Sequence, residues 1–97
     1  MSVVMKIEGL INGGSTAFDG QYVVEYDPCR DGREPETGRV MMCFLATTPD
    51  KNNASRFAGV SEARELWAAI DQRTPLRPDG KPNRPLTAFT VLIENVD

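Results

Sequence analysis

Four stretches of the chain alternate between apolar and polar residues with a period of two, and each predicts a β-strand. Residues 3–11 and 21–26 alternate in the manner of half-buried strands. In the second of these, Tyr22, Val24 and Tyr26 are expected on one face, and Val23 and Glu25 on the other. Residues 39–48 and 86–96 are apolar at both sets of alternating positions, which is typical of strands covered on both faces. We therefore expect these two strands inside the sheet, with the 39–48 strand near its middle.

A fifth stretch repeats apolar residues with the period of an α-helix. Ser61 is a suitable N-cap because its hydroxyl can accept a hydrogen bond from a first-turn N–H, and Glu62 places a carboxylate at the positive end of the helix dipole. Pro75 disfavours the helical conformation of the residue before it, so the helix is expected to end near Arg73. The apolar stripe that would face the sheet is made of Ala63, Leu66, Trp67 and Ile70.

The order of these elements, β-β-β-α-β, predicts an α+β fold in a single domain over residues 1–97. The simplest arrangement is a three-stranded antiparallel meander with the helix across one face. The C-terminal strand then returns to the sheet, and we expect it beside the first strand and parallel to the first and third strands.

Length and composition agree with one globular domain. The chain has 97 residues, of which 40% are hydrophobic and 26% charged, so a core can form without a metal or a disulfide. The sequence shows no signal-peptide pattern and no apolar run long enough to cross a membrane. We expect a cytoplasmic location, no membrane partner and no cofactor.

The chain has no histidine, which removes the commonest general base and the commonest zinc ligand. A calcium loop that begins at Asp27 would span residues 27–38, and the match is only partial because its third and twelfth positions are Cys29 and Gly38. We therefore predict no metal site and no enzymatic role. The remaining catalytic hypothesis is a small enzyme with Cys29 as nucleophile, since the guanidinium of Arg30 could lower the pKa of the thiol while the carboxylates of Asp27 and Asp31 oppose that effect.

Two loops of opposite charge stand out against the net charge of −3. Four cations and one anion between residues 73 and 85 give a net charge of +3, and prolines stiffen this basic loop, which lowers the entropy lost on binding. Two cations and six anions between residues 19 and 36 give −4. The basic loop offers Arg77, Lys81 and Arg84 to an anionic partner. The acidic loop offers Asp27, Asp31, Glu34 and Glu36 to a basic partner, for which it could mimic a phosphate backbone.

The segment from Phe57 to Trp67, followed by a loop and a terminal strand, resembles the C-terminal halves of many small uncharacterised bacterial and phage α+β proteins. The general build of the chain is similar to several phage-encoded inhibitors of bacterial defence, including some anti-CRISPR proteins. The resemblance covers about 40 residues at the C-terminal end and involves architectural residues. It implies a bacterial or phage origin and assigns no functional residues.

Together these observations predict a non-enzymatic interaction module that binds a macromolecule through its charged loops. A protein partner is favoured, such as a host defence or nucleic-acid-processing protein that the module would inhibit. A nucleic-acid-binding accessory protein that uses the basic loop 73–85 is the alternative. A homodimer is also expected, because two strands apolar on both faces have one helix to cover them.

Overall fold

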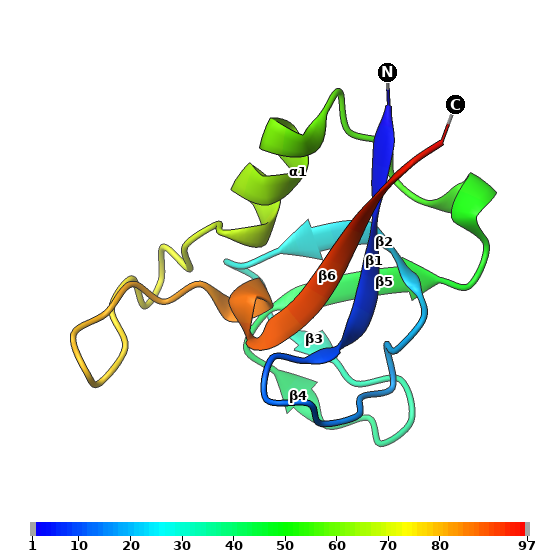
Figure 1. Cartoon of the computed structure of the whole chain (residues 1–97). Helices are drawn as coiled ribbons and strands as arrows, with labels where there is room; N and C mark the ends of the chain where they lie inside the picture. The colour runs from blue at the N-terminus through cyan, green and yellow to red at the C-terminus, as the bar shows by residue number, and fades with distance from the viewer. Residues whose placement is uncertain (1, 97) are drawn as a thin grey trace.

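The computed structural model describes residues 2–96 and shows an α+β fold (Figure 1). The main sheet is antiparallel and contains β1 (Val3–Leu10), β2 (Tyr22–Asp27), β5 (Phe44–Thr48) and β6 (Phe89–Asn95). A second, two-stranded sheet is formed by β3 (Gly32–Arg33) and β4 (Val40–Met41). The helices are α1 (Val60–Trp67) and two short 3-10 turns, Lys51–Asn53 and Pro85–Ala88.

The strand order of the main sheet is β5-β2-β1-β6. The antiparallel pairs β1–β2 and β2–β5 form the predicted meander, with the β3–β4 hairpin inserted between its second and third strands. The C-terminal strand lies beside the first strand, as predicted. The expectation that β5 and β6 are interior strands is wrong, because they form the two edges of the sheet.

The predicted direction of the last strand is also wrong, since β6 runs antiparallel to β1. Phe57 pairs with Val3 at the start of β1, and Phe89 pairs with Leu10 at its end. Residues 58–88 must therefore travel the full length of β1 before β6 begins. The prediction assumed that the helix would return the chain to the start of β1, but residues 49–57 already do so, because Phe57 pairs with Val3 before α1 begins.

The stretch 39–48, predicted as one strand, is divided into β4 and β5 by a bend at Met42 and Cys43. Gly32 explains how β3 approaches this bend, because a Cβ at Gly32 would lie 2.7 Å from the carbonyl oxygen of Cys43 and 3.0 Å from the Cα of Phe44. The alternating pattern continues across the bend, so periodicity alone does not reveal it.

A β-bulge in β2 changes which of its residues face the core. The register shifts between Val23, which pairs with Thr47, and Glu25, which pairs with Ala46, leaving Val24 as the extra residue. Val23 and Tyr26 are consequently both buried, whereas Val24 is exposed. The predicted alternation of faces along residues 21–26 is therefore wrong after Val23.

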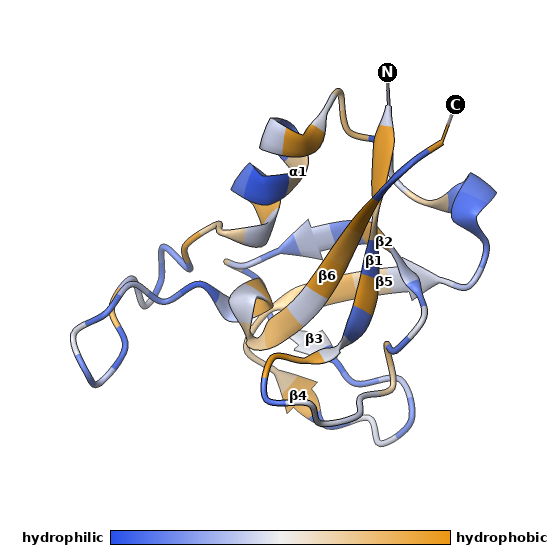
Figure 2. Cartoon of the chain, viewed as in Figure 1, coloured by the Kyte–Doolittle hydropathy of each residue, from blue (hydrophilic) through white to orange (hydrophobic). Residues whose placement is uncertain are grey.

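The core lies between the main sheet, α1 and the loops that flank it. Its largest fully buried apolar side chains include Met5, Ile7, Val23 and Leu86, and Phe18 meets Phe89 edge to face with ring centroids 6.0 Å apart. Figure 2 shows apolar residues along β1 and β6 and a mainly hydrophilic loop after α1.

Helix α1 is shorter than predicted and begins two residues earlier. Its N-cap is Gly59 rather than Ser61, and the Glu62 carboxylate accepts a hydrogen bond from the N–H of Ala58 at 3.0 Å. Of the predicted stripe, Ala63 is buried, and Leu66 and Trp67 pack against the core. Ile70 lies beyond the helix, because the chain turns at Ala68 and the N–H of Asp71 is drawn to the carbonyl of Asn83 at 2.9 Å.

Candidate functional site

The predicted basic loop folds into a hairpin that projects from the body of the molecule (Figure 1). Leu76 and Pro82 form its β-bridge, and the N–H of Arg77 donates to the carbonyl of Lys81 at 2.8 Å. The Asp79 carboxylate caps the N–H of Lys81 at 3.0 Å and pairs with the Arg77 guanidinium at 3.2 Å. Residues 76–82, which we call the basic hairpin, thus present Arg77 and Lys81 at an exposed tip.

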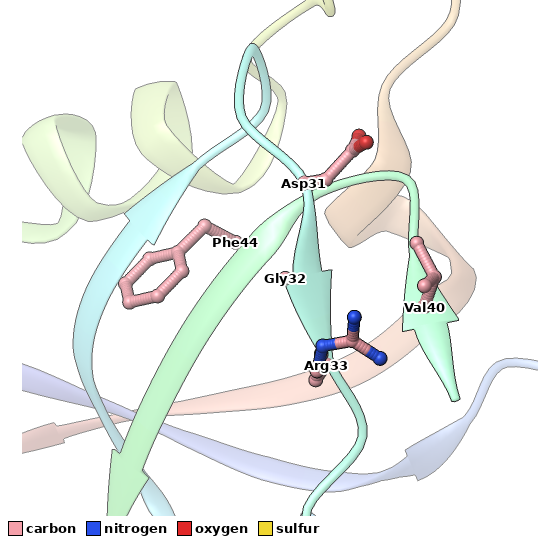
Figure 3. Close-up of a pocket in the computed structure, with 5 residues that line it drawn as sticks. All are labelled: Asp31, Gly32, Arg33, Val40 and Phe44. Carbon is pink, nitrogen blue, oxygen red and sulfur yellow. The ribbon is translucent and has the colours of Figure 1, made fainter. Parts of the chain in front are cut away.

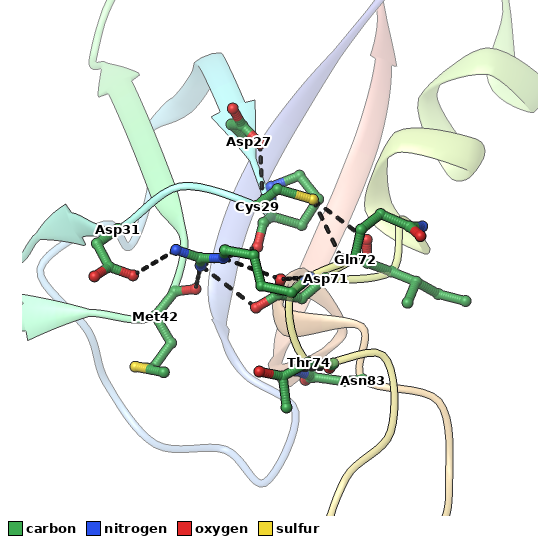
Figure 4. A network of polar contacts seen from close by, with 11 residues as sticks. Asp27, Cys29, Asp31, Met42, Asp71, Gln72, Thr74 and Asn83 are labelled. Carbon is green, nitrogen blue, oxygen red and sulfur yellow. Dashed lines mark hydrogen bonds and ion pairs between the residues drawn. The ribbon is translucent and has the colours of Figure 1, made fainter.

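Arg73, the first cation of this loop, is bonded within the fold, and Figure 4 labels its partners Asp31, Met42 and Asp71. Its guanidinium bonds to the carboxylates of Asp71 at 3.2 Å and Asp31 at 3.0 Å, and to the carbonyl of Met42 at 2.9 Å. Asp71 is 1% exposed and also accepts the Arg73 backbone N–H at 2.9 Å. Arg73 therefore joins the two loops of opposite charge that the sequence predicted as separate binding surfaces.

Electrostatics agree with this role. Hydrogen bonds from Arg73 hold the pKa of the Asp71 carboxyl below its usual value, and the same contacts raise the pKa of the Arg73 guanidinium. Both groups are thus charged at neutral pH, and they form an ion pair in which each compensates the charge of the other. The arrangement is structural, because the network leaves the buried carboxylate fully bonded.

The two cysteines are free, and they differ in their surroundings. The Sγ of Cys29 accepts the N–H of Gln72 at 3.2 Å, and the Cys29 N–H is capped by the Asp27 carboxylate at 2.8 Å (Figure 4). Cys43 is buried, and burial raises the pKa of its thiol to about 11. No group of three or more potential metal ligands gathers among residues 2–96. The Sγ of Cys29 contacts backbone groups, the N–H of Gln72 and the carbonyl of Ile70 at 4.0 Å.

The acidic residues of the predicted binding loop have separate surroundings. Asp27 caps the turn at Cys29, and Asp31 pairs with Arg73. Glu34 lines a small hollow of about 250 Å³ together with Phe18 and Phe89, while Glu36 is exposed in the turn between β3 and β4. Two of the four predicted contact residues are therefore occupied within the chain.

A hollow of about 490 Å³ lies beside β3 and β5 (Figure 3). Its lining includes Asp31, Arg33, Val40 and Phe44. The Arg30 guanidinium lies 3.9 Å from the centroid of the Phe44 ring. One anion, Asp31, and one cation, Arg33, line it. This hollow has no net charge to attract a partner of either sign.

The strongest candidate is formed by two adjoining hollows at the open edge of the sheet. The first, of about 600 Å³, is lined by Ile11, Trp67, Arg77 and Arg84, together with polar and small residues of the loop before β6. The second, of about 450 Å³, shares Ile11 and Trp67 and adds Arg64, Val91 and Ile93. Because they share two residues, we treat them as one site and call it the α1–β6 groove.

The α1–β6 groove combines an apolar floor with cations on its rim. Arg84 is held in place, because its guanidinium donates to the carbonyl of Ala68 at the end of α1. The indole Nε1 of Trp67 donates to the carbonyl of Phe89 at 3.2 Å, which fixes the ring between helix and strand. Within the described chain no carboxylate lines either hollow.

Of the predicted site residues, the structure brings Arg77 and Arg84 into one groove, and Lys81 lies on the same basic hairpin. Sequence reasoning missed Arg64, Trp67 and Ile11. The helical period assigns Trp67 to the buried face of the helix and Arg64 to its solvent face, and no local pattern places Ile11 opposite them. The three come together through the crossing of residues 58–88, which only the tertiary structure shows.

Comparison with protein-family models, with curated proteins and with solved structures finds no match to this chain. No helix in the described part of the chain has the length and apolar character needed to span a membrane.

Proposed function

We propose that this protein is a non-enzymatic, cytoplasmic interaction module that binds an acidic segment of a partner protein in the α1–β6 groove. The observation that carries the proposal is the lining of the groove, where Arg64, Arg77 and Arg84 lie with Trp67 and Ile11 and no carboxylate is among the lining residues. The Asp79 carboxylate, which pairs with Arg77 at 3.2 Å between exposed side chains, lies outside this lining. A partner with carboxylates beside an apolar side chain complements this surface. Arginine and tryptophan are also the residues that contribute most to binding energy at protein interfaces.

Nucleic acid remains the alternative partner, since arginines beside an indole could contact phosphates and stack on a base. The charge of the whole molecule favours protein. The net charge is −3, whereas nucleic-acid-binding domains carry a basic surface over a larger area. The indole edge of Trp67 is moreover bonded to Phe89, and the floor beside it is aliphatic, which suits an apolar side chain.

Two double variants test the role of the groove. Arg64→Gln with Arg77→Gln removes two cations from the rim without touching the Arg84 anchor, and Arg39→Gln with Arg56→Gln removes two exposed cations that do not line it. A fluorescein-labelled peptide of glutamate and valine residues is titrated with each protein and followed by fluorescence anisotropy. We expect the first variant to bind roughly 2- to 30-fold more weakly, since each exposed ion pair contributes about 0.2–1 kcal/mol.

The control variant should bind as the parent protein does. Equal weakening by both variants would show that the groove does not recognise the peptide. Tighter binding of single-stranded oligothymidine than of the peptide would make nucleic acid the partner.

A further inference from the structure

Strand β6 is an open edge of the main sheet, and the phase of its hydrogen bonds determines which backbone groups point outward. The N–H of Val96 donates to the carbonyl of Ser2 at 3.2 Å, so these residues form a hydrogen-bonded pair. Bonded and non-bonded pairs alternate along an antiparallel ladder, and the register puts Val91 and Ile93 at non-bonded positions. The N–H and C=O groups of Val91 and Ile93 therefore point away from β1, toward the open edge.

Two further contacts agree with this phase. On the far side of β1, the N–H of Ile7, the residue opposite Val91, donates to Gln21 at 2.8 Å rather than to β6. At the start of β6, the carbonyl of Phe89 points outward and accepts the indole N–H of Trp67 at 3.2 Å. Trp67 thus occupies one outward acceptor, and the next outward groups along the edge are those of Val91 and Ile93.

The side chains of Val91 and Ile93 line the same groove. They pack against the core but stay half-exposed, because the eight residues of α1 do not reach across the edge of the sheet. A strand placed along β6 would point alternate side chains into this space and cover both residues. The backbone and the apolar floor thus favour the same kind of ligand, which is an extended peptide.

We propose that the partner segment adds to the sheet as a fifth strand along β6, antiparallel to it, with acidic residues in its C-terminal half. This inference rests on the proposed function and defines its binding mode. Antiparallel pairs are the more frequent kind, and in that direction the C-terminal half of the segment lies at the Phe89 end of β6. Arg84 and Arg77 are found at that end, in the loop that leads into the strand.

The chain supplies its own probe, because Trp67 is the only tryptophan in the sequence and lies in the groove. The ligand is a synthetic peptide in which valine and threonine alternate and the last three residues are glutamates. Two derivatives carry N-methyl groups, one on the alternate amides that would face β6 and the other on the amides that would face solvent. Each peptide is titrated into the intact protein while the Trp67 emission is recorded.

We expect the parent peptide and the solvent-side derivative to bind alike, and the β6-side derivative to bind about tenfold more weakly or worse, because it lacks the donors to the carbonyls of Val91 and Ile93. Equal binding of the two derivatives, combined with sensitivity to Arg64→Gln and Arg77→Gln, would overturn strand addition and leave the proposed function intact.

Three results would overturn both proposals. The first is no change in Trp67 emission with any of the peptides up to about 1 mM. The second is peptide binding that does not respond to Arg64→Gln and Arg77→Gln. The third is a Trp67 emission that changes with protein concentration before peptide is added, with a matching dimer in sedimentation, since a second copy would then occupy the edge.

Discussion

At the scale of single residues, the buried polar groups of this chain hold segments that are distant in sequence. Tyr26 and Leu86 are 60 positions apart, and the hydroxyl oxygen of Tyr26 accepts the N–H of Leu86 at 3.0 Å in the core. Burial raises the pKa of the Tyr26 hydroxyl far above its usual value, so the group stays protonated at every physiological pH. The hydroxyl therefore serves as a fixed acceptor for the loop that leads into β6.

Replacement of Tyr26 by Phe tests this contact. The buried N–H of Leu86 would lose its acceptor, and we expect the free energy of unfolding in urea to fall by about 1–3 kcal/mol. Tyr22→Phe is the matched control, since the Tyr22 hydroxyl donates to the Glu94 carboxylate at 3.2 Å near the surface. Equal losses in the two variants would contradict the role of the buried hydroxyl.

Asp71 should make stability depend on pH. A carboxyl whose pKa is lowered in the folded state stabilises the protein above the ordinary value of 3.8, and that stabilisation disappears as the pH falls through the folded-state pKa. We expect Asp71→Asn to be less stable than the parent at neutral pH, and we expect this difference in the free energy of unfolding to narrow as the pH falls below 3.8. Urea unfolding at several pH values measures the gap, with Asp79→Asn on the basic hairpin as control. A gap that is constant with pH would count against the ion pair.

At the scale of elements, Gly32 allows β3 to lie against the bend between β4 and β5. Substitution by Ala would push a methyl group against the Cys43 carbonyl, 2.7 Å away. We expect a loss of about 1–3 kcal/mol in the free energy of unfolding, as for other overpacked sites. Thermal or urea unfolding measures the loss. Unchanged stability would show that the two segments can separate at no cost.

The sequence was sufficient for the types of the longer elements and for part of the topology. Period-two alternation located β1 and β2, and the apolar stripe located α1, because these signals are local. It failed where tertiary contacts decide: the Arg73 network fixes the segment after α1, and Gly32 lies against the bend that splits β4 from β5. The sequence predicts β6 as an interior strand because its residues are apolar at both sets of alternating positions. Residues that line an open groove, such as Val91 and Ile93, give the same pattern as residues covered by a neighbouring element.

The candidate site was predicted in part for the same reason. Arg77 and Arg84 can be identified as cations of a basic segment from the sequence alone. Arg73 adds to the net charge of the same segment, but it forms ion pairs with Asp31 and Asp71 within the fold. Trp67 and Arg64 line the groove because residues 58–88 run along β1 to the start of β6, and this path is visible only in the tertiary structure. Charge counts along a chain therefore identify a basic segment without showing which of its cations reach solvent.

At the scale of the whole molecule, a cation-lined groove on a protein of net charge −3 makes the affinity for an acidic ligand depend on salt concentration. The groove attracts carboxylates at short range, while the rest of the molecule repels them at long range. We expect affinity for the acidic peptide to fall as NaCl is raised from about 0.05 to 0.5 M, because exposed ion pairs are screened. The Trp67 titration at each salt concentration measures this. An affinity that rises with salt would point to a purely apolar site.

The bulge in β2 also bears on how this chain tolerates a change in length. In a regular strand, loss of one residue turns every later side chain to the opposite face. Val23 and Glu25 already pair with the neighbouring residues Thr47 and Ala46, so deleting Val24 would leave a continuous ladder with Val23 and Tyr26 still inward. Val24 is thus the position in this strand where a single-codon deletion is compatible with the existing core.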